Sequence, residues 1–505
     1  MNRKKLIRIL AIVLAALLVG GVVFSALVSA LAEEQTVVGN VERNRHEITL
    51  EYLEDEQALH ITQRLIYINE TGIELRSVVF YAAGNMFRRE SALMYGPDAL
   101  EQVFFDGYAP AGIDLRTATC DGKPTDFGFQ GEDELYMRVD CDVAPGESCA
   151  FEFDYYLLLM RCGAFQGVGD TDVRLSAFYF APVPYDEALG EFAIKKPLAF
   201  TRWLHSAAAD FAVRLTLPEG WEVASTGEGA AEDDGSDGVA WRITAENVRE
   251  FALSFGKRYR VAERMTDSGV RVRALTNVRG GAKRALDAAM EAVEQCEAWF
   301  GPFPASELDL AQSDYPVGAL NFPGAVWVPE ALLAPSREED LKDAIRFCVA
   351  QQYFGLSAYV EPVADAWLSD SVSAYVAMLL REAAEGHDSF LAAVNREWVS
   401  ALQQTVPGGL TVTSDAALFD EKTYDIVVRR RGAVVLHELR EAMGLEALLA
   451  GLSNFYRMGG EKDVLTEMDF VAAMDAADGG SWEDFLTDWV FNVGDYVNQT
   501  IDWFE

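Results

Sequence analysis

Two hydrophobic patterns divide the chain. Up to about residue 258, apolar and polar positions alternate over many short segments separated by turn residues. A period of two in short segments is typical of antiparallel strands with one buried face. The pattern therefore predicts an antiparallel β-sandwich or saddle domain over residues 35–258. The alternation is clearest in HEITLEYL, ALHITQRLIYIN, SCAFEFDYYLLL, DFAVRLTLP, VAWRITA and FALSFGKRYRV.

From residue 259 onward the period lengthens. Apolar residues recur every three to four positions, and several segments end at Gly, the usual residue after a helix. A few strand-like segments, such as VRVRALT and AVWVP, precede the long helices. We therefore predict a mainly helical domain over residues 259–505 and an α+β multidomain protein. The helical pattern is clearest in KRALDAAMEAVEQCEAWFG, EEDLKDAIRFCVAQQYFG, LSDSVSAYVAMLLREAAEG and RRGAVVLHELREAMG.

The amino-terminal segment is a continuous uncharged run without alternation of apolar and polar residues. Residues from Ile9 to Ala32 are uncharged, and a helix of that length reaches about 36 Å, enough to cross a hydrocarbon core of about 30 Å. The basic residues before it favour a cytoplasmic amino terminus. We therefore predict that residues 1–34 form a cytoplasmic stub and an uncleaved transmembrane signal anchor. A cleaved signal peptide is the alternative, because ALA at 30–32 offers small residues for cleavage.

Charge and cysteine content limit the partners and the compartment. The chain has 80 acidic and 42 basic residues, a net charge of -38, which argues against nucleic acid as a partner. With the anchor, an extracytoplasmic bulk on a single-pass membrane protein is expected. Four cysteines in one short region would then suit two disulfides, with three pairings open. These are Cys120, Cys141, Cys149 and Cys162.

Five short motifs carry a resemblance to a known family. The motifs AWFGPFP, GALNFPGAVWV, QQYFG, AWLSDSVSAY and RRRGAVVLHELREAMG occur in this order. In order and spacing the chain resembles the membrane alanyl aminopeptidase family of zinc metallopeptidases, the family of aminopeptidase N, from about residue 40 to the end. The resemblance implies a β-saddle domain followed by a thermolysin-like (gluzincin) catalytic domain.

The family's zinc site is degenerate in this chain. Its members bind zinc through two histidines of an HExxH helix and a glutamate of the next helix, and a base glutamate acts on the metal-bound water. Anchoring on QQYFG places the histidines at Phe347 and Gln351, the base at Cys348 and the third ligand at Asp370. A phenyl ring has no lone pair and an amide is a poor zinc ligand. We therefore expect no zinc and no other cofactor, and interpret Cys348 as a small buried hydrophobe.

Two further functional positions of the family differ. The glutamate that holds the substrate amine aligns with Asn321 in GALNF, the motif that also places Gly318 and Ala319 in the expected cleft. The tyrosine that stabilises the oxyanion aligns with Arg429. Tyr424, five residues earlier, is interpreted as a packing residue. Every element of the family's reaction is thus replaced.

These replacements favour a membrane-anchored pseudopeptidase whose former active-site cleft binds a peptide or protein. One alternative is an active peptidase with a divergent site around Cys348, Asp370 or Tyr424. Another is a structural partner of an active paralogue. Arg429 with its two basic neighbours, Arg430 and Arg431, would suit an acidic peptide, but a basic helix start on the surface is the simpler interpretation. No two of the five histidines have metal-ligand spacing.

Overall fold

The computed structural model describes residues 43–90, 101–195, 197–198, 200–202, 204–232, 238–316 and 318–492. From Asn44 onward the chain forms one compact unit. The predicted anchor, Ile9–Ala32, lies outside the described residues. Within them, no helix combines the length and the apolar composition needed to cross a bilayer.

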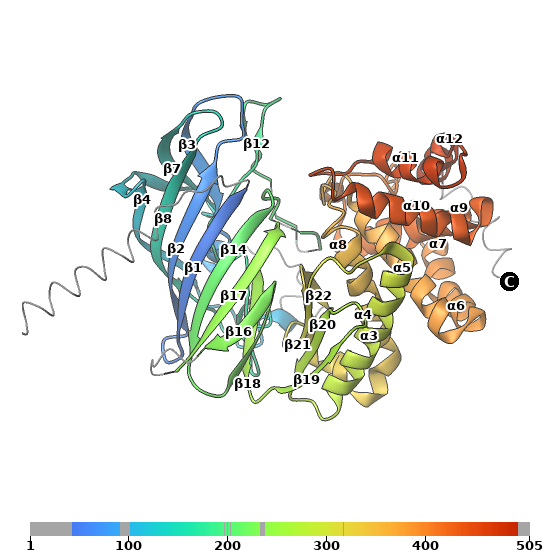
Figure 1. The fold of residues 1–505 in the computed structure, drawn as a ribbon, viewed down its shortest axis with the longest axis horizontal. Helices are drawn as coiled ribbons and strands as arrows, with labels where there is room; N and C mark the ends of the chain where they lie inside the picture. Colours follow the sequence, from blue (N-terminus) through green and yellow to red (C-terminus); the bar gives the residue numbers. More distant parts are fainter. Residues whose placement is uncertain are drawn as a thin grey trace, which may run out of the picture. The chain divides into compact units, whose positions relative to one another are not determined.

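An eight-stranded sheet dominates the first half of the unit (Figure 1). Its strands pair antiparallel except at one place, where β1 and β14 run parallel. Buried and partly exposed residues alternate along β14 without a break, as the period-two pattern requires. The strand order is β16 (Glu228–Glu232), β17 (Val239–Val248), β14 (Ala209–Leu217), β1 (Asn44–Leu53), β2 (Ala58–Ile68), β8 (Ser148–Leu158), β4 (Gly112–Cys120) and β5 (Lys123–Pro124).

Smaller sheets complete this half, and residues of all three larger sheets share one hydrophobic core. The predicted β-rich amino-terminal part is thereby confirmed. One sheet has the order β15 (Trp221–Ser225), β18 (Ala252–Lys257), β10 (Val173–Ser176) and β9 (Gln166–Val168). A second has β11 (Ala181–Pro182), β3 (Leu75–Tyr81), β7 (Tyr136–Val143) and β6 (Phe127–Gln130), and β12 (Tyr185–Asp186) pairs with β13 (Glu191–Phe192).

A five-stranded sheet opens the second half. Its three middle strands run parallel and its two outer strands antiparallel. The long helix α3 (Gly281–Phe300) follows β20 and packs on it. The strand order is β19 (Arg260–Met265), β20 (Arg271–Thr276), β21 (Glu307–Ser313), β23 (Ala325–Pro329) and β22 (Leu320–Phe322).

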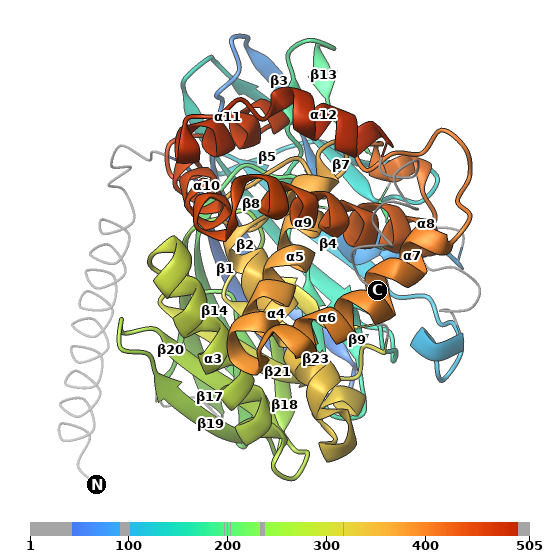
Figure 2. The ribbon, with the colours of Figure 1, turned by 90° about the vertical axis from the view of Figure 1, so that its right-hand side faces the viewer.

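The rest of the chain is helical, which confirms the predicted helical carboxy-terminal part (Figure 2). α4 packs between α3 and α5, and α5 packs on α9. A π-helical turn, η7 (Asp425–Arg431), joins α8 to α9. The α-helices are α4 (Glu338–Tyr353), α5 (Ala366–Glu385), α6 (His387–Val394), α7 (Ser400–Gln403), α8 (Glu421–Tyr424), α9 (Gly432–Met443), α10 (Leu445–Met458), α11 (Glu467–Asp478) and α12 (Glu483–Asn492).

The cysteines differ from the prediction. All six are free thiols in the structure, so the two predicted disulfides are not formed. Cys141, Cys149 and Cys162 are buried in the core of the β-rich half, and Cys120 packs against it. Their apolar surroundings explain their place in the sequence, because a cysteine packs like a small hydrophobic residue.

Candidate functional site

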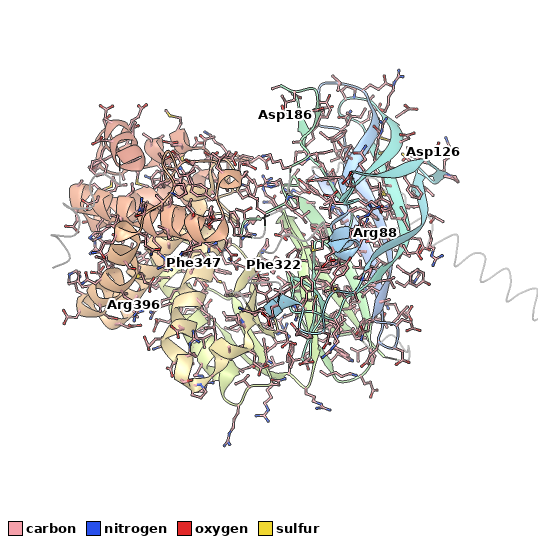
Figure 3. The ribbon with its side chains drawn as sticks, turned by 180° about the vertical axis from the view of Figure 1, so that it is seen from behind. Arg88, Asp126, Asp186, Phe322, Phe347 and Arg396 are labelled. Carbon is pink, nitrogen blue, oxygen red and sulfur yellow. The ribbon has the colours of Figure 1, made fainter. Side chains whose placement is uncertain are left out.

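A cavity of about 340 Å³ lies where residues of the β-rich half meet the helices. Figure 3 marks two of its lining residues, Phe322 of β22 and Phe347 of α4. The structure brings every residue of the site predicted from the sequence to this one cavity. These residues are Gly318, Ala319, Asn321, Phe347, Cys348, Gln351, Asp370, Tyr424 and Arg429.

Helix α4 supplies the first wall. Three acidic residues in its first turn favour the helix dipole. Phe347 and Gln351 lie one turn apart and both line the cavity. Cys348 between them is 1% exposed, and burial raises the pKa of its thiol to about 12. A thiol with that pKa supplies little thiolate at neutral pH, which agrees with the interpretation of Cys348 as a small buried residue.

Asp370 of α5 is the centre of the polar contacts. Gln351 donates through Nε2 to Asp370 Oδ1 at 2.9 Å. The hydroxyl of Tyr424 donates to Oδ2 at 3.1 Å, and Arg429 donates to the same oxygen through Nε at 3.0 Å. Both oxygens of the carboxylate therefore have protein donors, and an opposite charge balances its own.

Two glycines allow helix α5, which carries Asp370, to lie close to its neighbouring elements. Gly355, at the end of the QQYFG motif, has a φ of +115°, and a Cβ there would collide with Ser369, the residue before Asp370. Gly432 begins α9, and a Cβ at that position would collide with Ser371 of α5. Ser371 in turn donates to the carbonyl of Val428 at 2.7 Å. The absence of a side chain at these two glycines thus lets α5 lie close to the end of α4 and to η7. Asp370 of α5 is thereby within hydrogen-bond distance of Arg429.

Arg429 corrects one prediction. It does not lie on an outer surface, because its side chain lines the cavity and pairs with Asp370. The guanidinium carbon lies 5.8 Å from the ring centre of Phe347 and 5.4 Å from that of Tyr424. Burial opposes the positive charge, but the neighbouring Asp370 outweighs burial and raises the pKa of Arg429 above its ordinary value.

The other two arginines of RRRG do not share this environment. Arg430 pairs with Asp425 at 2.8 Å, and the two side chains are 36% and 34% exposed. Arg431 is buried and donates to the backbone carbonyl of Gln404 at 2.6 Å. Of the three arginines, therefore, only Arg429 adds charge to the cavity.

Tyr424 combines packing with a polar contact. Its ring is buried against Phe200 and Phe419, as expected for a packing residue. Its hydroxyl nevertheless binds Asp370, a contact that the sequence did not indicate. Burial and the nearby Asp370 carboxylate both raise the pKa of Tyr424, so the hydroxyl keeps its proton and remains a donor.

The side chain of Asn321 forms hydrogen bonds with residues of α4. Its side-chain nitrogen donates to the carbonyl of Cys348 at 2.9 Å, and its side-chain oxygen accepts from Gln352. An amide has one donor group and one acceptor group, and here each has a protein partner. Asn321 therefore ties β22 to α4 and offers no carboxylate to a ligand amine.

Three charged residues of the cavity were not predicted from the sequence, namely Arg202, Glu250 and Glu421. Arg202 lies 3.5 Å from Glu250, measured from Nη1 to Oε2, and its Nη2 donates to the carbonyl of Asn321 at 3.3 Å. Burial raises the pKa of Glu250 to about 7. Neither Arg202 nor Glu250 belongs to a motif with recognisable spacing, and only the packing of the β-rich half against the helices brings these two to the cavity.

The residues of the site do not fit a zinc ion. Of the three aligned ligand positions, only Asp370 carries a charged donor, and its oxygens already bind protein groups. Zinc sites in proteins use three or four histidine, cysteine or carboxylate ligands. Over the part of the chain that the structure describes, no three such side chains are placed to hold a metal ion.

The comparisons with known proteins identify the fold. No family model and no curated protein sequence matches the chain. Among solved structures it is similar to a mutant M1 zinc metallopeptidase from Deinococcus radiodurans, with TM-score 0.60, 17% identity, and coverage of 89% of this chain and 94% of that chain. The same mutant enzyme bound to a Tyr-Ser-Ala substrate gives TM-score 0.59 and 18% identity over 89% and 93% of the two chains. The chain therefore has the M1 peptidase-like α+β fold.

Proposed function

We propose that this protein is a non-catalytic member of the M1 peptidase fold whose cavity binds a peptide segment. One observation carries the proposal. Asp370, the single charged residue among the aligned ligand positions, binds Gln351, Tyr424 and Arg429. Its carboxylate is thus used to hold the protein together and has no oxygen left without a protein donor.

The other parts of the site agree with this proposal. Hydrolysis of a peptide bond needs an activated nucleophile, and the Cys348 thiol is buried and protonated. At the position aligned with the oxyanion-stabilising tyrosine stands Arg429, whose Nε donates to Asp370. The cavity nevertheless persists, and its volume of about 340 Å³ falls in the range of small-ligand sites.

A peptide is the ligand class that the fold favours. The M1 metallopeptidase of similar fold was solved with a Tyr-Ser-Ala substrate. Phe200, Phe322 and Phe347 line the cavity of this chain and offer apolar surface to side chains of such a peptide. The predicted amino-terminal anchor would present the cavity outside the cell membrane.

Metal content and turnover test the non-catalytic part. The full-length protein is expressed in zinc-supplemented medium, purified without chelator, and analysed by mass spectrometry for bound metals. We expect far less than one zinc per chain and no chelator-sensitive cleavage of aminoacyl or internal-peptide substrates. Stoichiometric zinc with chelator-sensitive turnover would contradict the proposal and favour the divergent active peptidase.

Peptide binding is tested with Tyr-Ser-Ala and a variant that fills the cavity. Calorimetric titration of the full-length protein should detect the peptide, and Ala319→Trp should abolish binding because Ala319 lines the cavity. Ala188→Trp is the matched control, because Ala188 is exposed and is not one of the residues that line the cavity. Binding that survives Ala319→Trp would place the peptide elsewhere.

A further inference from the structure

Arg429 presents unused hydrogen-bond donors to the cavity. Its Nε donates to Asp370, with which the guanidinium forms an ion pair, and no hydrogen bond joins its terminal nitrogens, Nη1 and Nη2, to any residue that the structure describes. The side chain lines the cavity and is 32% exposed. A guanidinium offers its donors in a planar fork that matches a carboxylate with two parallel hydrogen bonds.

The guanidinium is also held in place before any ligand arrives. The Nε contact to Asp370 fixes one edge, and the rings of Phe347 and Tyr424 lie near the guanidinium carbon. A side chain that is already ordered loses little entropy on binding, so more of the interaction energy goes into affinity. This arrangement is typical of a binding group and differs from a mobile surface arginine.

Two arginines of the cavity lining are candidate partners for an anion. Arg202 and Arg429 both act electrostatically on Cys348. Two carboxylates oppose them, Asp370 and Glu250. Because burial raises the pKa of Glu250 to about 7, this group is partly protonated at neutral pH and compensates Arg202 only in part. Glu421 also lines the cavity, but it is exposed to solvent, which screens its charge.

We propose that the cavity selects peptides that bring a free carboxylate to the terminal nitrogens of Arg429. The inference rests on the proposed function, that the cavity binds a peptide, and adds the chemical class of the group that is recognised. The carboxylate comes either from an acidic side chain or from a peptide carboxy terminus. A ligand amine has no place at this point, because it would meet the positive charge of Arg429.

Three probes of equal length separate these sources. The first is N-acetyl-Ala-Ala-Glu-amide, the second is N-acetyl-Ala-Ala-Gln-amide, and the third is N-acetyl-Ala-Ala-Ala with a free carboxy terminus. Calorimetric titration of the full-length protein at neutral pH should show that the Glu probe or the free-acid probe binds at least about tenfold more tightly than the Gln probe. The tighter of the two acids identifies the source of the carboxylate.

Variants link this discrimination to Arg429. Arg429→Gln combined with Asp370→Asn removes both charges of the pair together, so no buried charge is left without its partner. In this double variant the acidic and neutral probes should bind with equal affinity, while the melting temperature reports that the fold persists. Arg430→Gln is the matched control, because Arg430 pairs with Asp425 instead, and it should keep the full discrimination.

Several outcomes overturn the inference. Equal affinity for the Glu and Gln probes in the natural protein, with the free-acid probe no tighter, would leave a peptide site without carboxylate selection. Discrimination that persists in the double variant would assign it to another residue, and no measurable binding of any probe would also reject it. The zinc and turnover measurements are independent of these results, so the non-catalytic function can fail or stand separately.

Discussion

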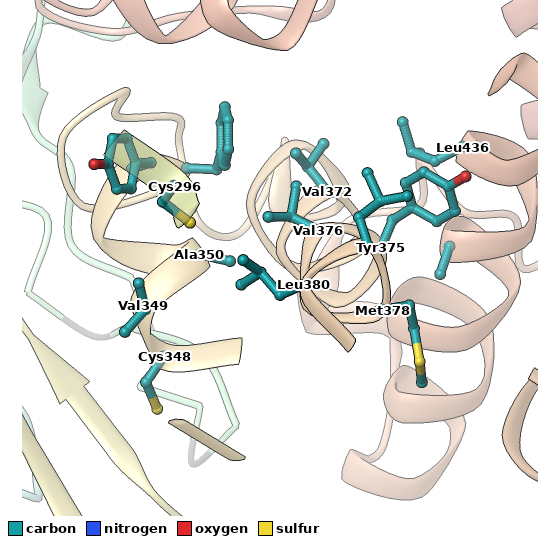
Figure 4. Packing of buried hydrophobic residues seen from close by; sticks show 14 of the residues in the cluster. Cys296, Cys348, Val349, Ala350, Val372, Tyr375, Val376, Met378, Leu380 and Leu436 are labelled. Carbon is teal, nitrogen blue, oxygen red and sulfur yellow. The ribbon is translucent and has the colours of Figure 1, made fainter. Parts of the chain in front are cut away.

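Helices α4 and α5 meet through apolar side chains on one face and through polar side chains on the face that lines the cavity. The two faces place different demands on the residue types that the sequence supplies. On the face inside the helical half, apolar side chains meet, and Figure 4 shows Ala350 of α4 and Leu380 of α5 pointing toward one another. On the cavity face, Gln351 and Asp370 meet through a hydrogen bond. The apolar face needs shapes that fill space, whereas the cavity face needs only that each polar group finds a partner.

This difference explains how one pair of helices carries both a packed core and a polar cavity. Apolar packing among α3, α4 and α5 fixes the spacing of the helices. Cys348 and Ala366 belong both to this packing and to the cavity lining, whereas Gln351 and Asp370 lie outside the apolar core. At the cavity face the guanidinium of Arg429 supplies the positive charge that balances the carboxylate of Asp370. The framework of the helices and the charge balance of the cavity thus depend on different contacts.

The largest expected effect comes from rebuilding zinc ligands on the cavity face. Phe347→His, Gln351→His and Asp370→Glu restore the ligand types, but Arg429 would remain beside the ion. Two unit charges at about 4 Å interact by about 4 kcal/mol at an effective dielectric constant near 20, so repulsion of the ion should weaken zinc binding a hundredfold or more. Adding Arg429→Tyr should recover that affinity, as measured by competition with a zinc-binding dye. Equal zinc affinity with and without Arg429→Tyr would show that Arg429 does not oppose the metal.

On the apolar face, truncation should cost stability. Leu380 is 2% exposed, and Leu380→Ala should lower the free energy of unfolding by about 3 kcal/mol through lost burial and a cavity. Chemical denaturation of the full-length protein measures this loss. Exposed Leu418 gives the matched control, because Leu418→Ala should change the free energy of unfolding by less than about 0.5 kcal/mol. A small effect at Leu380 would contradict the assignment of stability to this face.

Glu250 should make stability depend on pH. Its pKa in the folded state is about 7, above the ordinary value of 4.5, so the folded state keeps this proton where the unfolded state has lost it. The contribution is full below pH 4.5 and is lost as the pH rises through 7. Between pH 5 and 8 the stability of the natural protein should fall by about 2 kcal/mol relative to Glu250→Gln. A difference that does not change with pH would show that Glu250 is ionised throughout.

The smallest expected effect concerns the ion pair at the cavity face. Arg429→Gln alone leaves the carboxylate of Asp370 without its charged partner and should cost about 1 to 2 kcal/mol of unfolding free energy. Asp370→Asn added to it should recover part of this loss, because no net charge is then left behind. Arg430→Gln should be near neutral, since its pair with Asp425 is partly exposed. Additive losses in the double variant would argue against coupling between Asp370 and Arg429.

Part of the site could be read directly from the sequence. The resemblance carried by QQYFG, AWLSDS and RRRG implied which residues share a cavity, and one helical turn places Phe347 and Gln351 on the same side of a helix. The identity of Phe347 and Gln351 also shows that neither position offers an imidazole ligand, since side-chain chemistry does not depend on the fold. Likewise, the change from a period of two to a longer period located the β-rich and helical halves.

Only the tertiary structure decided how the charges are arranged. The three arginines of RRRG cannot be told apart in the sequence, but their partners in the structure differ. Arg429 pairs with Asp370 in the cavity, Arg430 pairs with Asp425, and Arg431 donates to the backbone carbonyl of Gln404. Tyr424 gained a polar role, and Arg202 with Glu250 joined the site from the other half of the chain. Sequence patterns record which side chains are buried, but a partner distant in the chain is chosen by three-dimensional proximity, and the electrostatics of the cavity depend on that choice.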